Sequence, residues 1–176
     1  KVYDLPEGSR NSKGRSLANI IQKEKDENVT AYMPIKEFEE GWYLLMATEH
    51  GIVKKTDLSK YANIRQTGII ALNLNDDDRL IKVMLTDGKC DVILGSRNGM
   101  ACRFRESDVR PIGRTATGVI GISLAPDDVV VSMVVIKRPD QQIIVVGENG
   151  YGKRTKYEDF RRSEERRVGK ECATGC

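Results

Sequence analysis

The chain has 176 residues, 39% hydrophobic and 31% charged, so it is ordinary in composition for a soluble globular protein and long enough to bury a core. Its formal net charge of +3 excludes a protein that is basic all over, but allows a basic edge balanced by acidic turns. No apolar run approaches the roughly eighteen residues that span a bilayer, and no signal segment opens the chain, so we expect a cytoplasmic protein with no membrane partner.

A repeated pattern is already running at residues 1–3, where there is no initiator Met, so we expect a piece of a longer protein. Gly14, Gly68 and Gly118 each begin an apolar segment that leads into an acidic turn and then into a second apolar segment. Alternating apolar residues between turn signals favour strands over helices. The acidic turns lie at residues 25–27, 76–78 and 127–128, and the strands predicted after them lie at 29–33, 80–85 and 129–136.

A second Gly recurs later in each repeat, and each copy closes a predicted two-residue hairpin turn. These residues are Gly51, Gly99 and Gly150, and they follow predicted strands at 43–49, 91–97 and 142–148. The fourth residue after the Gly is basic every time, namely Lys55, Arg103 and Arg154. A spacing of about 50 residues is typical of propeller blades, which cannot bury their faces alone. Only residues 35–40 indicate a helical turn.

These repeats predict an all-β fold of propeller-like blades. In sequence order, one blade is a strand, an acidic turn, a strand, a hairpin and a basic loop, which makes two complete blades, at about 15–67 and 69–117, and most of a third. That number is too small to close a ring. We therefore expect an incomplete ring, whose open sheet edges invite association or fraying.

The cysteines do not predict disulfides. A two-residue loop at Gly99 places Cys102 opposite Gly95, which leaves Cys90 five residues further along the strand, beyond the reach of a disulfide. We therefore expect Cys90 and Cys102 to be reduced thiols in the core or on the surface. Cys172 and Cys176 belong to the charged stretch at residues 162–176.

Basic residues occupy two places in every repeat: the strand after the hairpin Gly, and the loop around the other Gly. The candidate DNA-binding set is Arg10, Lys13, Arg15, Lys54, Lys55, Arg65, Arg103, Arg105, Arg110, Arg114, Lys153, Arg154 and Lys156. A solvated strand face explains any one of them, but their recurrence predicts a rim of cations on stacked blades. Such a rim holds phosphates without reading bases and offsets the cost of bending a duplex. Aromatic residues for base stacking are only 6% of the chain, which favours duplex DNA over single strands.

Other kinds of site find less support. His50, the only His, stands where Asn98 and Asn149 stand in the other hairpins, so we interpret it as a turn residue that builds no catalytic triad. The acidic turns lack the spacing of a calcium loop, and we expect no metal. The glycines of residues 147–152 belong to a hairpin rather than to a phosphate loop, because no helix is predicted after them.

Together these motifs resemble the family of C-terminal domains of the DNA gyrase A protein, over about residues 1–161. The residues that carry the resemblance are 5–10, 13–15, 36–41, 51–56, 103–110 and 149–155. The resemblance implies a six-bladed β-pinwheel, in which neighbouring blades exchange strands. It also implies a domain that wraps duplex DNA around a basic outer rim and serves an ATP-dependent type IIA topoisomerase that introduces negative supercoils.

In that family the catalytic tyrosine and its neighbouring arginine lie in a separate domain, and none of the six Tyr of this chain follows an Arg. The resemblance therefore implies a non-catalytic piece of an isomerase. It implies no cofactor in this chain, with ATP and Mg²⁺ acting elsewhere in the parent complex. It also implies that the full-length gyrase A protein has the gyrase B protein as its partner.

Two alternatives remain open. The basic, Gly-rich box that distinguishes gyrase from topoisomerase IV is absent, and residues 9–15 only echo it, so the chain could be the equivalent domain of the topoisomerase IV A protein. A kelch or WD40 interaction scaffold is the other alternative. The sequence has neither the Gly-Gly doublet nor the Trp-Asp pair that punctuates those repeats.

Residues 162–176 interrupt the third repeat with a charged stretch that does not alternate. This stretch resembles the translation of a DNA-sequencing adapter. We interpret it as a non-native tail that should be excluded from fold reasoning, with a solvated basic terminus as the alternative.

Overall fold

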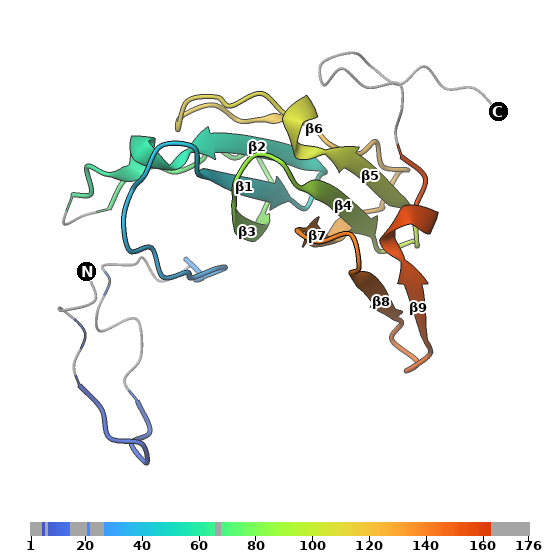
Figure 1. Ribbon diagram of the computed structural model, residues 1–176, viewed down its shortest axis with the longest axis horizontal. Coiled ribbons are helices and arrows are strands. Elements are labelled where there is room, and N and C mark those ends of the chain that lie inside the picture. The colour runs from blue at the N-terminus through green and yellow to red at the C-terminus, as the bar shows by residue number, and fades with distance from the viewer. Residues whose placement is uncertain (1–4, 6, 15–20, 22–26, 66–67, 163–176) are drawn as a thin grey trace.

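The computed structural model describes residues 5, 7–14, 21, 27–65 and 68–162. The regular structure in this part of the chain consists of strands and three short 3-10 helices, which confirms the all-β prediction (Figure 1). The strands are β1 (Tyr43–Thr48), β2 (Ile52–Asp57), β3 (Leu80–Thr86), β4 (Asp91–Ser96), β5 (Ala101–Arg105), β6 (Val119–Ile120), β7 (Val130–Ile136), β8 (Gln142–Val146) and β9 (Gly152–Lys156). The helices are η3 (Leu58–Tyr61), η4 (Glu106–Asp108) and η5 (Tyr157–Asp159).

These strands form three antiparallel sheets, in the orders β3-β1-β2-β6, β5-β4-β7 and β8-β9. They stand one after another along the molecule and do not close into a ring (Figure 1). Among the described residues, no helix has the length and apolar character needed to cross a membrane.

Each hairpin turns through three residues rather than the two that we predicted. The Gly at the end of each loop has a positive φ, +84° at Gly51, +88° at Gly99 and +80° at Gly150, as in a turn that ends with a left-handed residue. The extra loop residue shifts the ladder by one, so Cys102 pairs with Leu94 and not with Gly95. Cys90 and Cys102 are both reduced, as expected.

The strand after each acidic turn pairs with the hairpin before it, not with the hairpin after it. β3 pairs with β1, and β7 pairs with β4, with an irregularity in register at the same place in both ladders. Backbone hydrogen bonds beside the turns hold each of these strands against the earlier hairpin. The amide of Glu49 donates to the carbonyl of Arg79 at 2.7 Å, and the amide of Arg97 donates to the carbonyl of Val129 at 2.8 Å. The grouping of strands into blades at 15–67 and 69–117 was therefore wrong by one strand.

Two local predictions in the first repeat were also wrong. Residues 29–33 are not a strand, and residues 35–40 contain no helical turn. The equivalents of residues 29–33 are β3 and β7, each of which pairs with a hairpin that begins about 40 residues earlier. In this structure Met33 and Ile35 instead pack against the buried cluster that contains Leu44 and Met46.

The first two sheets share one core. Leu45 and Val53 of the first sheet pack in the same buried cluster as Val92 and Leu94 of the second. The chain after β5 returns to the first sheet as β6, which pairs with β2. Gly121 follows directly, where an added Cβ would stand 2.4 Å from a methyl of Val53, so glycine permits the close approach of the two sheets.

The β8–β9 hairpin joins the rest through a smaller cluster, in which Ile143 packs with Ile93 and Ile136. Tyr157 and Phe160 of the segment after β9 lie against the same cluster. The third sheet is therefore attached at one end, and Figure 1 shows it extending away from the other two.

Candidate nucleic-acid interface

The basic residue four positions after the hairpin Gly connects one repeat to the next. The Lys55 ammonium donates to the carbonyl of Glu106 at 2.9 Å, and Nη1 of Arg103 donates to the carbonyl of Tyr157 at 3.4 Å. Glu106 and Tyr157 hold the same position, seven residues after the next hairpin Gly. The two strands also make equivalent isolated parallel bridges, Lys55 with Pro111 and Arg103 with Arg162.

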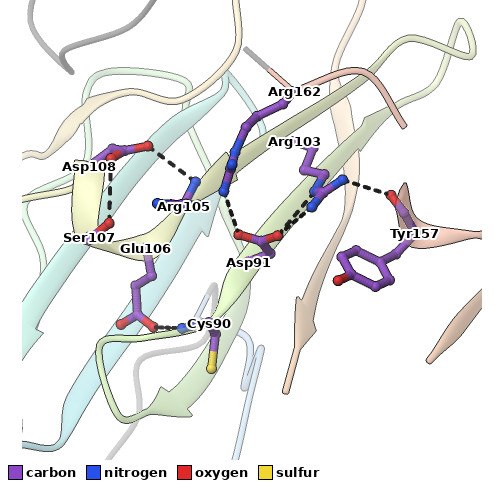
Figure 2. A network of polar contacts seen from close by, with 9 residues as sticks. All are labelled: Cys90, Asp91, Arg103, Arg105, Glu106, Ser107, Asp108, Tyr157 and Arg162. Carbon is purple, nitrogen blue, oxygen red and sulfur yellow. Dashed lines mark hydrogen bonds and ion pairs between the residues drawn. The ribbon is translucent and has the colours of Figure 1, made fainter. Parts of the chain in front are cut away.

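Aromatic and acidic side chains complete these connections. The Lys55 ammonium lies 5.1 Å from the centre of the Tyr43 ring, and the Arg103 guanidinium lies 4.6 Å from that of Tyr157. Figure 2 shows Arg103 and Arg162 converging on Asp91, at 2.7 Å and 3.3 Å. Sequence reasoning missed Asp91. In the hairpin Asp91 pairs with Arg105, so it lies diagonally across from Arg103, and this diagonal relation could have indicated the ion pair.

Lys54 is buried more deeply, with 1% of its surface exposed. Its ammonium donates to the carbonyl of Ala71 at 2.9 Å and also to that of Arg114. Desolvation by burial, helped by the charge of Arg114, lowers the pKa of Lys54 to about 8. Burial likewise lowers the pKa of Lys55, although Glu106 and Asp108 act in the opposite direction.

Lys54 and Lys55 therefore do not lie on an exposed rim, which corrects the prediction for these two residues. Segments from later repeats cover β2, and they present backbone carbonyls that a long basic side chain can satisfy. Arg103 is also engaged, with 12% of its side chain exposed. Arg114 is half-buried, and its Nη1 donates to the carbonyl of Ile70 at 3.1 Å.

The other predicted cations within the described residues face solvent. They are Arg10, Lys13, Arg65, Arg105, Arg110, Lys153, Arg154 and Lys156, whereas Arg15 lies outside the described residues. Arg105 and Arg110 flank η4 in the second repeat, and the three cations of β9 line an open cleft of about 730 Å³. Arg154 is exposed although its equivalents Lys55 and Arg103 are not, because no described segment covers β9 as later repeats cover β2 and β5.

The two acidic turns that the structure describes hold hairpins in place, whereas residues 25 and 26 of the first acidic turn lie outside the described residues. Asp78 accepts the backbone N–H of His50 at 2.9 Å, and Asp128 accepts that of Asn98 at 3.0 Å. Hydrogen bonds, first from Ser96 and then from backbone amides, lower the pKa of Asp128. His50 is thus a turn residue, as predicted, and Asp78 and Asp128 each cap the loop of the hairpin that precedes them in the chain.

A second acidic cluster lies where sequence reasoning placed none. One ligand atom each of Asp87, Cys90 and Glu106 falls within 4.8 Å of the others. Glu106 is fully buried and accepts hydrogen bonds from Thr86 and from the Cys90 amide. Burial, and then the hydrogen bond from its sulfur to Asp87, raise the pKa of Cys90 to about 11. These contacts fit a structural role, because each of the three side chains has a hydrogen-bond partner within the chain.

The pattern of repeats agrees with a known family. Residues 1–33, 43–87, 91–137 and 141–163 match the family described as "DNA gyrase C-terminal domain, beta-propeller". The chain belongs to this family. The second and third matched segments each contain one hairpin and the strand after it, which is the grouping that the sheets show.

Curated relatives share this region of a much longer protein. The chain is 51% identical over 160 residues to the DNA gyrase A protein of Salmonella typhimurium, an alignment that covers 91% of the chain and 18% of that protein. It is 44% identical over 176 residues to the DNA gyrase A protein of Staphylococcus epidermidis, an alignment that covers 99% of this chain and 20% of that protein. The chain thus spans about a fifth of the length of these relatives.

Solved structures with the same fold come from two kinds of topoisomerase. The C-terminal domain of DNA topoisomerase IV superposes with a TM-score of 0.86 at 36% identity, covering 92% of this chain and 50% of that one. A DNA gyrase A C-terminal domain superposes with a TM-score of 0.69 at 28% identity, covering 81% of this chain and 47% of that one. The fold is therefore common to both enzymes.

Proposed function

We propose that this chain binds duplex DNA without sequence preference and wraps it, as the DNA-wrapping module of a gyrase A protein. The observation that carries the proposal is the division of its cations. Some lie inside the fold and connect the repeats, whereas eight of those described face solvent. The exposed group includes Arg105 and Arg110 beside η4, and three cations side by side on β9.

A rigid surface with separated clusters of cations suits a stiff polyanion. Phosphate contacts supply sequence-independent affinity, and each contact releases counterions. The ties at Lys55 and Arg103 hold neighbouring repeats in fixed relation, so the exposed clusters keep a fixed spacing. A duplex that follows several clusters must bend, and each additional contact offsets part of that cost.

The parent protein follows from the relatives, and it too is a proposal. We infer an ATP-dependent type IIA topoisomerase of the cytoplasm, in which the full-length gyrase A protein assembles with the gyrase B protein. ATP and Mg²⁺ act elsewhere in that complex, and we assign no cofactor site or catalytic residue to this chain. The level of identity to gyrase A proteins supports this parent.

A second candidate is the C-terminal domain of the topoisomerase IV A protein. The higher TM-score of the solved topoisomerase IV domain favours it, 0.86 against 0.69 for the gyrase domain. Circularising DNA on the chain with ligase and measuring the linking number separates the two candidates. A shift in linking number of one sign indicates chiral wrapping of the gyrase kind, and no shift favours the second candidate.

Binding itself is tested with the double variant Arg105→Ala/Arg110→Ala. Anisotropy of a labelled duplex, titrated at several salt concentrations, should show weaker binding and a slope of log K against log salt that is reduced by up to about 2. The matched control is Lys137→Ala/Arg138→Ala, which removes two exposed cations after β7 that lie outside the proposed set. Equal losses in both variants, or none in either, would overturn the proposal.

A further inference from the structure

Two cations lie together at the joint between the first two repeats without a carboxylate beside them. The Lys54 ammonium is buried and donates to the backbone carbonyl of Arg114, whose guanidinium repels it. Within the described residues, no acidic side chain forms an ion pair with either cation. A buried charge without a counterion costs free energy, so the pair calls for an anion that the fold does not supply.

The neighbouring lysine and the next repeat show that the fold has other solutions. Burial lowers the pKa of Lys55, but Glu106 and Asp108 act in the opposite direction and offset part of the cost. In the next repeat, the position of Lys54 is occupied by Cys102, which packs against the core without a charge. Joining two repeats therefore does not require a cation at this position.

Lys54 connects two loops that carry exposed cations. Its ammonium donates to the carbonyl of Ala71 at 2.9 Å and also to that of Arg114, so it bridges the segment between η3 and β3 and the segment between η4 and β6. Arg65 lies on the first of these segments and Arg110 on the second, and both face solvent. One buried side chain thus holds two basic loops against each other.

Arg114 keeps donors for a ligand. Its Nη1 donates to the carbonyl of Ile70 at 3.1 Å, and within the described residues this is the one hydrogen bond of the guanidinium. A guanidinium carries five N–H donors in a planar fork that fits the oxygens of a phosphate. The residue is only partly buried, so the remaining donors are within reach of a molecule that approaches from solvent.

We propose that a backbone phosphate of duplex DNA docks on the Arg114 guanidinium, and that Lys54 is the positioning residue that holds this guanidinium and places a second charge behind it. This assignment rests on the proposed function, and it names one place where the duplex is held. The phosphate is the counterion that the two cations lack. Lys54 does not touch the DNA, in keeping with its burial.

This arrangement links DNA binding to a proton. Desolvation by burial, followed by the charge of Arg114, lowers the pKa of Lys54 to about 8. A phosphate on Arg114 offsets that repulsion and raises the pKa of Lys54 again, so binding takes up a proton in solutions more alkaline than this value. Tyr61 also donates to the Ala71 carbonyl, at 3.1 Å, but burial raises its pKa, so it stays neutral in this range.

Isothermal titration calorimetry of the full chain with a duplex, in buffers of different ionisation enthalpy, measures this proton. We expect wild-type binding to take up a fraction of a proton at about pH 8.5, and almost none at about pH 7, where Lys54 is charged with or without DNA. At constant salt, the affinity should fall several-fold from about pH 7 to about pH 9.5. Lys54→Met should abolish the uptake and flatten this profile.

Two further variants complete the experiment. Lys55→Met is the matched control, because it removes an adjacent buried ammonium that has carboxylates near it, and it should keep the wild-type uptake. Arg114→Ala removes the proposed phosphate contact and should lose most of the uptake. Because Arg114 is only partly buried, this variant remains informative if circular dichroism shows that Lys54→Met does not fold.

The outcomes that would overturn this assignment differ from those that would overturn the proposed function. Wild-type binding without proton uptake at about pH 8.5 rejects the role of Lys54 but leaves duplex binding intact. Uptake that persists in Lys54→Met or in Arg114→Ala shows that another group titrates, and it rejects this site. A chain that binds no duplex at any pH rejects the proposed function and the site together.

Discussion

The ammonium of Lys55 lies 2.9 Å from the carbonyl oxygen of Glu106, a residue of the next repeat. Both groups are buried. A cation chosen by its recurrence as a DNA contact is therefore part of the joint between two blades. Arg103 makes the equivalent bond to Tyr157, so the recurrence of a basic residue at this position has a structural cause.

We expect Lys55→Met to lower the free energy of unfolding by about 1–3 kcal/mol, because it removes the charged hydrogen bond to the buried Glu106 carbonyl, which then keeps only the Val109 amide as a donor. Urea unfolding measures this change. Lys60→Met, which alters an exposed lysine at the end of η3, should leave the midpoint almost unchanged. If the two variants unfold alike, the contact contributes nothing to stability.

Burial of Lys54 predicts a dependence of stability on pH. Its pKa is lowered from 10.5 to about 8 in the folded chain, so between these values the unfolded chain binds more protons than the folded one. The free energy of unfolding should therefore rise as pH increases from about 8 toward 10.5, relative to Lys54→Met, in which this rise is absent. A wild-type curve parallel to that of the variant across this window would contradict the shift.

Asp91 and Arg103 should be energetically coupled. The carboxylate accepts from both Nε and Nη2 of Arg103, at 3.1 Å and 2.7 Å, and both side chains are largely shielded from solvent. A double-mutant cycle of Asp91→Ala and Arg103→Ala, followed by thermal unfolding, should give a coupling of about 1–2 kcal/mol. Additive effects would show that the pair is no more than adjacent.

Gly121 should not tolerate a side chain. Its added Cβ would lie 2.4 Å from a methyl of Val53 and 3.0 Å from one of Leu94, in the core shared by two sheets. We expect Gly121→Ala to cost about 1–3 kcal/mol. The control is Gly113→Ala, where nothing lies within 4 Å of the added Cβ and φ is not positive. Calorimetry of both variants compares them directly.

The parts of the fold that depend on neighbouring residues were predictable. The three hairpins, their positive-φ Gly and the turn role of His50 all follow from short segments, because strands joined by a few residues close at small entropic cost. The three-residue loop was not anticipated, and this one additional residue moved Cys102 from Gly95 to Leu94.

The candidate site was predictable only as a set of positions. The sequence shows that Lys55, Arg103 and Arg154 each stand four residues after a hairpin Gly. Whether the side chain at this position is exposed depends on which segments of later repeats cover it. Lys55 and Arg103 are covered by the segments after the next hairpin, whereas Arg154 is not covered by any described residue. The assignment of residues 162–176 as a non-native tail stays a prediction, since residues 163–176 lie outside the described part of the chain.

By itself, the amino-acid sequence determined the repeat, its strands and its turns, because alternation and turn residues act over a few positions. Only the tertiary structure decided which hairpin the strand after each acidic turn joins, and which cations are buried. Both depend on contacts between segments tens of residues apart, where the deciding quantity is burial against a partner rather than any local preference. For Lys54, that partner is a pair of backbone carbonyls from two later loops.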